Sequence, residues 1–202
     1  MPKAFTEREK ETIREQLLEK GKALFESQGI RKTTVDELTQ AVGISKGAFY
    51  MFFDSKEELY MQVLEQLEDE IQARILGFAM HPDADARQHV YQLLRSMVHT
   101  MEEFAILKHF SRADLDYLVR KLPPERVLQH ADSDQLFMQD FIRKIGQEGI
   151  TVSASPEVVG NLVKSLFFLS LHREDYGAQA YDEMIDVLIH LVAGYITGEH
   201  LG

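Results

Sequence analysis

The sequence predicts an all-α protein, and three observations lead to this fold class. The 202 residues include only 12 Gly and 5 Pro, about 8% against an average near 12%, which favours long helices over many short strands. Capping patterns and apolar stripes at helical spacing recur along the chain. No segment sustains the alternation of apolar and polar residues that marks a strand. We therefore expect helices and no sheet.

Four helices are expected in the first part of the chain. Capping boxes, in which a hydroxyl and a carboxylate three residues apart cover exposed N–H groups, mark three helix starts: Thr6 with Glu9, Thr34 with Glu37, and Ser55 with Glu58. Ser45 can cap a fourth helix. Gly29 and Gly43 are suited to end helices. The expected helices cover about residues 7–28, 34–42 and 46–52, followed by a long helix from residue 55 to near His81 and Pro82.

The rest of the chain shows the same periodicity, with one irregular stretch. Helices are expected over about residues 84–101, 125–148, 156–174 and 178–198, and residues 102–122 are less regular. The Asp-Ser-Asp sequence at 132–134 could bend or split the helix in which it lies. Ser155 followed by Pro156 is a strong helix start.

Charge and composition narrow the classes of function. The net charge is −11, and the first 60 residues hold 10 basic and 11 acidic residues, so nearly all of the excess lies beyond them. DNA binding is therefore expected only through a local patch near the N-terminus. The chain has no Cys, and its His residues form no ligand cluster, so neither a metal site nor a cofactor is expected. The longest uncharged apolar run, residues 187–198, is too short for a membrane span of about 20 residues, and we predict a soluble cytoplasmic protein.

Residues 34–53 carry the functional prediction. A short helix, a turn at Gly43-Ile44-Ser45 and a second short helix have the length of a helix-turn-helix, whose second helix enters the major groove of DNA. Gly47 is unfavourable in a helix but allows close backbone approach. Lys46 can reach a phosphate or a guanine edge, and Tyr50 can reach a phosphate. Lys56 lies in the first turn of the long helix, where a bridging DNA phosphate would offset its conflict with the helix dipole.

At this point the sequence resembles the tetracycline-repressor (TetR) family of bacterial transcriptional regulators. The resemblance covers about residues 7–65 and rests on Thr33-Thr34, the Gly43-Ile44-Ser45-Lys46-Gly47 turn, Tyr50, Phe53, and the Asp54-Ser55-Lys56-Glu57-Glu58-Leu59 entry to the long helix. It implies a homodimer that binds palindromic double-stranded operator DNA and responds to a small-molecule effector. The expected DNA-binding residues are Thr34, Ser45, Lys46, Gly47, Ala48, Tyr50, Phe52 and Lys56.

The sequence departs from the family pattern at two positions of the second short helix. Many members have a polar ring at the position of Phe52 and a polar residue at that of Met51, whereas both are apolar here. The two side chains either contact thymine methyl groups or fold inward.

Two domains are expected: a DNA-binding domain over residues 1–54 and a larger effector-binding and dimerisation domain over 55–202. The last two helices are apolar over an arc wider than one buried stripe requires, so we expect them to form a four-helix dimer interface with a second copy; the alternative is a monomer with a deep core. The expected interface residues are Val159, Val163, Phe167, Ile185, Leu188 and Val192.

The effector pocket is expected among Phe and Met residues in the middle of the chain, because flat rings and adaptable Met side chains suit an apolar cavity; ordinary core packing suits them equally well. The candidates are Met97, Met101, Phe104, Phe110, Phe137, Phe141 and Phe168, with His172 as the polar member.

These observations predict a DNA-binding transcriptional regulator, a repressor released from its operator by a small apolar or amphipathic effector. The sequence contains no nucleophile elbow, phosphate-binding Gly-rich loop or acid–base pair, so an enzyme is not expected. Two alternatives remain at this point: a helical enzyme or carrier for a small apolar ligand, and a helical adaptor that binds only protein.

Overall fold

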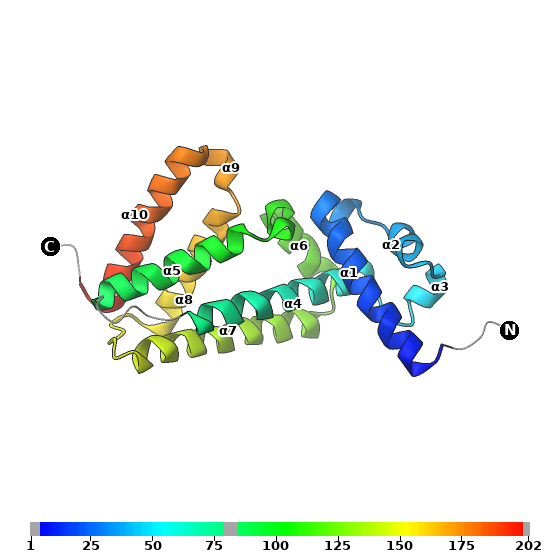
Figure 1. Cartoon of the computed structure of the whole chain (residues 1–202), viewed down its shortest axis with the longest axis horizontal. Helices are drawn as coiled ribbons and strands as arrows, with labels where there is room; N and C mark the ends of the chain where they lie inside the picture. The colour runs from blue at the N-terminus through cyan, green and yellow to red at the C-terminus, as the bar shows by residue number, and fades with distance from the viewer. Residues whose placement is uncertain (1–4, 79–84, 200–202) are drawn as a thin grey trace. The chain divides into compact units, whose positions relative to one another are not determined.

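The computed structural model describes residues 5–78 and 85–199, and within these ranges it contains helices and no strand (Figure 1). The predicted all-α fold class is confirmed. Contacts divide the chain into two compact units. The N-terminal unit comprises Met1–Asp69 and Ala105–Pro124, and the C-terminal unit comprises Glu70–Phe104 and Glu125–Gly202.

The N-terminal unit begins with three helices that follow the expected pattern. Its helices are α1 (Glu7–Lys32), α2 (Val35–Val42), α3 (Lys46–Phe49), the start of α4 (Lys56–Gly77), the 3-10 helix η1 (Ala105–His109) and α6 (Arg112–Lys121). The expected capping boxes at Thr6 and Thr34 are both present. Gly29 interrupts α1 with φ 74° and ψ 167°, where the sequence placed the end, and one further turn reaches Lys32.

The first helices pack around a small, mainly apolar core. Phe25 of α1 meets Tyr60 of α4 edge to face, with ring centroids 4.8 Å apart. A Cβ at Gly21 would stand 3.1 Å from Leu59 Cδ2, so α1 and α4 approach each other closely. The other residues with no exposed side-chain surface in this core are Leu17, Leu38, Phe49 and Leu59.

Segments η1 and α6 were expected only as an irregular stretch over 102–122. They form a regular pair of short helices because a further capping box starts α6, between Ser111 and Asp114. This box uses Asp at the third helical position, where the sequence pattern looks for Glu or Gln. Both segments belong to the N-terminal unit, and η1 packs on α1.

The C-terminal unit is a second helical bundle. It contains α5 (Ala86–Glu102), α7 (Pro124–Gln147), α8 (Pro156–Ser170), α9 (Arg173–Tyr176) and α10 (Ala178–Thr197). Helix α10 packs along α5 and α8, and the Ser153 N–H donates to the Ile196 carbonyl at 2.8 Å, which fastens the link before α8 to the end of α10.

Two expected boundaries differ from the structure. Helix α7 runs unbroken through residues 132–134; Asp132 and Ser133 are exposed there and need no buried partner, so they do not interrupt the helix. Helix α4 ends at Gly77, and its expected end near His81 and Pro82 lies outside the described residues.

Candidate nucleic-acid interface

Helices α2 and α3 form the expected helix-turn-helix. Gly43 ends α2 in the left-handed region at φ 77°, and the Ser45 side chain caps α3 by accepting from the Ala48 N–H at 3.2 Å. Regular helix stops at Phe49, earlier than expected, because the Met51 and Phe52 N–H groups donate to carbonyls three residues back. Ala48 and Phe49 are buried and bind α3 to the core.

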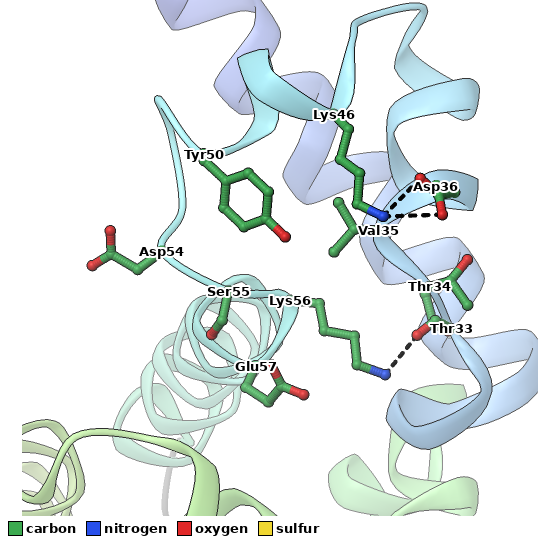
Figure 2. Close-up of a pocket in the computed structure, with 10 residues that line it drawn as sticks. All are labelled: Thr33, Thr34, Val35, Asp36, Lys46, Tyr50, Asp54, Ser55, Lys56 and Glu57. Atoms are coloured by element: carbon green, nitrogen blue, oxygen red, sulfur yellow. Dashed lines mark hydrogen bonds and ion pairs between the residues drawn. The ribbon is translucent and has the colours of Figure 1, made fainter.

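A cleft of about 430 Å³ opens beside this motif, between the starts of α2 and α4 and the outer side of α3 (Figure 2). Its residues are Thr33, Thr34, Val35, Asp36, Lys46, Tyr50, Asp54, Ser55, Lys56 and Glu57. This cleft thus brings together four of the residues expected to bind DNA, namely Thr34, Lys46, Tyr50 and Lys56.

The two lysines of the cleft are in different situations. Lys46 is exposed and lies 3.1 Å from the carboxylate of Asp36. Lys56 donates to the carbonyl oxygens of Ile30 at 2.7 Å and Thr33 at 2.6 Å, with a longer contact to Arg31. Burial lowers the pKa of Lys56, because desolvation of the ammonium outweighs the attraction of Glu57 and Glu37.

The environment of Lys56 differs from the one expected from the sequence. The Lys56 ammonium donates its hydrogen bonds to carbonyl oxygens at the end of α1. No bridging anion is therefore needed to explain a cation at the start of α4. Lys56 instead fixes the corner between α1 and α2. Thr34 starts α2 at this corner, and its hydroxyl is engaged with Glu37 in the capping box.

The residues after α3 separate into outward and inward side chains. Tyr50 is 51% exposed and Met51 is 60% exposed. Phe52 is half-buried, with its ring centroid 6.3 Å from that of Phe5, and Arg14 donates to its carbonyl at 3.2 Å. Of the two alternatives for these apolar positions, Phe52 therefore folds inward and Met51 is free to meet a partner.

Gly47 is an exposed position on α3 with open space around it. A Cβ built there would meet only the Ser45 hydroxyl oxygen, at 3.9 Å, and the φ of Gly47 is not positive. Neither internal packing nor backbone conformation requires glycine at this position.

Helix α6 contacts the rear of the cleft through two polar interactions that sequence reasoning missed. Arg31 pairs with the largely buried Asp114 at 2.9 Å, and the Tyr117 hydroxyl donates to Glu57, which is 8% exposed. A capping box at Ser111 would have revealed α6 but not its partners. These contacts join α6 to the end of α1 and the start of α4.

Replacing Tyr117 with Phe is expected to destabilise the protein by about 1–3 kcal/mol, because the buried Glu57 loses a hydrogen-bond donor. Burial, followed by the bond to Glu57, raises the pKa of Tyr117 from 10 to about 12. The folded state therefore holds this proton more tightly, so the stabilisation is complete below pH 10 and is lost as the pH rises towards 12. Thermal unfolding of both proteins across this range should show their difference narrowing.

Tyr50→Phe provides the matched control for this prediction. Tyr50 is 51% exposed, so loss of its hydroxyl should leave the stability unchanged at every pH. A difference between wild type and Tyr117→Phe that stays constant up to pH 12, or one that Tyr50→Phe reproduces, would contradict the assigned role of Tyr117.

Comparison with known proteins identifies the family. Residues 17–63 match the family model of bacterial regulatory proteins of the tetR family. The matched segment contains most of α1, together with α2, α3 and the start of α4, which line the cleft. The chain carries the DNA-binding segment of the TetR family. It is thus a DNA-binding transcriptional regulator and not an enzyme.

Individual relatives support the same assignment over different lengths. YfiR of Bacillus subtilis (strain 168), an uncharacterized HTH-type transcriptional regulator, is 25% identical over 170 residues, covering 83% of this chain and 80% of YfiR. KstR2 of Rhodococcus jostii (strain RHA1), an HTH-type transcriptional repressor, is 38% identical over 58 residues, which is 29% of this chain and 28% of KstR2. The crystal structure of PfmR, a TetR family regulator from Thermus thermophilus, has a TM-score of 0.59 and 22% identity over 88% of this chain and 96% of PfmR, and shows the shared fold.

The expected effector residues of this TetR-family chain lie in both units. Met97, Phe104 and Phe141 are buried in the C-terminal unit. Phe110 belongs to the N-terminal unit, so the structure does not bring the whole set into one bundle. His172 is exposed and pairs with Asp175 at 3.0 Å. The remaining candidates are half-buried: Met101, Phe137 and Phe168.

The expected dimer residues lie mainly inside the chain's own core. Four are buried within the single chain, namely Val159, Val163, Ile185 and Val192, and two are half-buried, Phe167 and Leu188. Different apolar residues of the same helices face outward: Val158 of α8 is 39% exposed, and Val187 and Leu191 of α10 are 52% and 41% exposed.

Two further findings concern the described part of the TetR-family chain. Within it, no three His, Asp or Glu side chains are grouped so that they could hold a metal ion. None of its helices combines the length and apolar character needed to cross a membrane.

Proposed function

We propose that this TetR-family regulator is a homodimeric repressor whose two helix-turn-helix motifs bind a palindromic operator, and that a small apolar or amphipathic effector releases it. In this proposal the protein acts in the bacterial cytoplasm, where its operator lies. Residues 1–54 bind DNA, and residues 55–202 provide the effector pocket and the dimer interface, with α6 held against the DNA-binding helices.

The observation that carries the DNA-binding role of α3 is the empty space at Gly47. Alanine there would favour the helix by up to about 1 kcal/mol, and the chain has room for it. A partner whose surface approaches the α3 backbone accounts for the glycine. The major groove of DNA admits a helix at such close range.

The neighbouring residues divide into contact and positioning roles. Lys46 reaches a phosphate, the exposed Tyr50 hydroxyl donates to another, and Met51 meets a thymine methyl group. Thr34, Ser45 and Lys56 act through the backbone that they hold, because their side chains cap α2, α3 and the end of α1. Ala48 and Phe52 shape α3 from inside.

A binding-site selection separates this function from a helical ligand carrier or a protein-only adaptor. The full chain is incubated with a pool of random-sequence duplexes, and the bound DNA is amplified and sequenced over several rounds. The proposal predicts enrichment of one inverted-repeat motif. Enrichment of no motif, under conditions where the chain is folded, would favour the alternatives.

Dimerisation is proposed through the outward faces of α8 and α10. Val187 and Leu191 are one turn apart on α10 and remain exposed in the single chain. Burial of these apolar side chains away from water is favourable. In a two-fold dimer, the same residues of the second copy would bury them. The half-site spacing of a palindrome then follows from the dimer.

The effector is expected to be apolar or amphipathic, since the candidate residues in the C-terminal unit are Phe and Met side chains that can repack around different ligands. A panel of fatty acids, acyl-CoAs and lipophilic cations should contain a compound that raises the unfolding temperature. A free concentration one hundred times the dissociation constant stabilises the folded state by about 2.7 kcal/mol.

The same panel is then tested for release of the protein from the selected operator. A compound that stabilises the chain and releases the DNA supports the proposal, because an effector shifts the equilibrium only by its different affinity for the two states. Stabilisation by sugars or metal ions alone would contradict an apolar pocket. Tight binding of a compound that does not release the operator would contradict the proposal that α4 couples the effector pocket to the DNA-binding helices.

A further inference from the structure

We propose that Asp36 is an internal competitor of DNA, whose carboxylate holds Lys46 in the free protein and releases it when a phosphate binds. The proposal rests on the proposed function, in which Lys46 contacts the DNA backbone. It assigns to Asp36 a specific role in that function: it weakens binding to every DNA sequence by a similar factor.

The geometry places the competitor at the contact itself. The Lys46 Nζ lies 3.1 Å from each carboxylate oxygen of Asp36, so the ammonium faces the middle of the carboxylate (Figure 2). Lys46 is the first residue of α3, and Asp36 is in the first turn of α2. Both side chains line the cleft with Tyr50, so a phosphate that enters the cleft meets the pair directly.

Because the Lys46–Asp36 ion pair is exposed, Lys46 can exchange Asp36 for a phosphate at a small cost in free energy. The side chains of Lys46 and Asp36 are 55% and 72% exposed, and an ion pair this open contributes only about 0–1 kcal/mol. Lys46 can therefore change partner without a large loss of stability. Asp36 remains favourably placed after the exchange, because the first turn of α2 stabilises a negative charge.

The exchange opposes DNA binding in two ways. Lys46 must leave one anion to gain another, and the vacated carboxylate then lies beside the phosphate and repels it. Two other acidic residues line the cleft, but their environments differ. Glu57 is buried and accepts from Tyr117, and Asp54 lies at the far side of the cleft with its carboxylate directed away from Lys46 (Figure 2).

The test measures binding of the full chain to a short random-sequence duplex at several salt concentrations. Asp36→Asn should tighten binding by a factor of about three to ten, the value expected for removing one charge near a phosphate in a solvated cleft. The plot of the logarithm of the binding constant against the logarithm of the salt concentration should become steeper by up to about 0.9, the value for one phosphate contact, because Asp36 no longer counteracts the contact of Lys46 with phosphate. The selected operator should show the same factor.

Two controls distinguish exchange from a general change of charge. Asp54→Asn removes the same charge from the same cleft and should change the affinity much less. In a Lys46→Met background, Asp36→Asn should lose the part of its effect that comes from competition for Lys46 and keep only the part that comes from direct repulsion of the phosphate, and a double-mutant cycle measures the difference. Circular dichroism checks that every variant is folded.

The possible failures are separable. If wild type binds DNA but Asp36→Asn has no effect, or has the same effect as Asp54→Asn, or keeps its full effect without Lys46, then Asp36 is not a competitor for Lys46 and the proposed function still holds. If wild type binds neither the random duplex nor any selected sequence, the proposed function fails and the competitor role fails with it.

Discussion

Gly47→Leu should abolish operator binding and leave the fold intact. A Cβ at this exposed position meets only the Ser45 hydroxyl oxygen of the protein itself. Because leucine also favours a helix over glycine by up to about 1 kcal/mol, the variant should be at least as stable as wild type. Bound DNA, however, would meet the new side chain where the α3 backbone should approach it. We expect a loss of at least about a hundredfold in affinity, equivalent to about 2.7 kcal/mol, measured by fluorescence anisotropy on the selected operator.

Gly146→Leu is the matched control. Gly146 lies within α7, and a Cβ there likewise meets nothing within 4 Å. The same substitution at this position should affect stability similarly and leave DNA affinity unchanged. Tight binding by Gly47→Leu would show that α3 does not dock with its backbone close to DNA.

The double variant Val187→Arg/Leu191→Arg should convert the dimer to folded monomers. Both residues are exposed in the single chain, so arginine costs little there, whereas two charges facing their symmetry mates in a closed interface would each cost several kcal/mol. We expect the dissociation constant to rise by at least about a thousandfold, or about 4 kcal/mol. Analytical ultracentrifugation measures this rise, and operator affinity should fall with it.

Leu128→Arg/Leu136→Arg provides the control for charge and surface polarity. These residues of α7 are 65% and 62% exposed, and the substitutions add the same two charges away from α8 and α10. The control should remain dimeric. A stable dimer in the α10 variant would place the interface elsewhere, and an unfolded chain would contradict the exposure of Val187 and Leu191.

The helix-turn-helix could be predicted from sequence because local chemistry determines it. Gly43 ends α2 in a left-handed conformation that favours glycine, and hydroxyls at Thr34 and Ser45 cap the helices that follow them. These effects act over three or four residues. A single sequence therefore contains all the information needed to place the motif.

The charge partners could not be predicted in the same way. Lys56 is 23 residues from Thr33, whose carbonyl it binds, and Asp36 is 10 residues from Lys46. Such pairs arise when separate helices pack together. The first basic residue of α4 therefore suggested a phosphate ligand, whereas the structure shows it holding the α1–α2 corner.

The dimer face illustrates a different limit of sequence reasoning. Periodicity shows that α10 is apolar over a wide arc, but it does not show which side of the arc packs on α5 and α8. Ile185 and Val192 cover that inner side and are buried. The proposed interface consequently moves to Val187 and Leu191, which lie near the opposite side of the helix from Ile185, because each residue advances about 100° around the helix axis.

We propose that two α3 helices of one dimer read a palindromic operator, and a hydroxyl-radical footprint of the full chain on the selected operator is the decisive measurement. We expect two protected backbone clusters related by the symmetry of the DNA, with centres about one helical turn or a whole multiple of it apart, and no protection with Gly47→Leu. A single unsymmetrical cluster, or an unchanged footprint with Gly47→Leu, would contradict it.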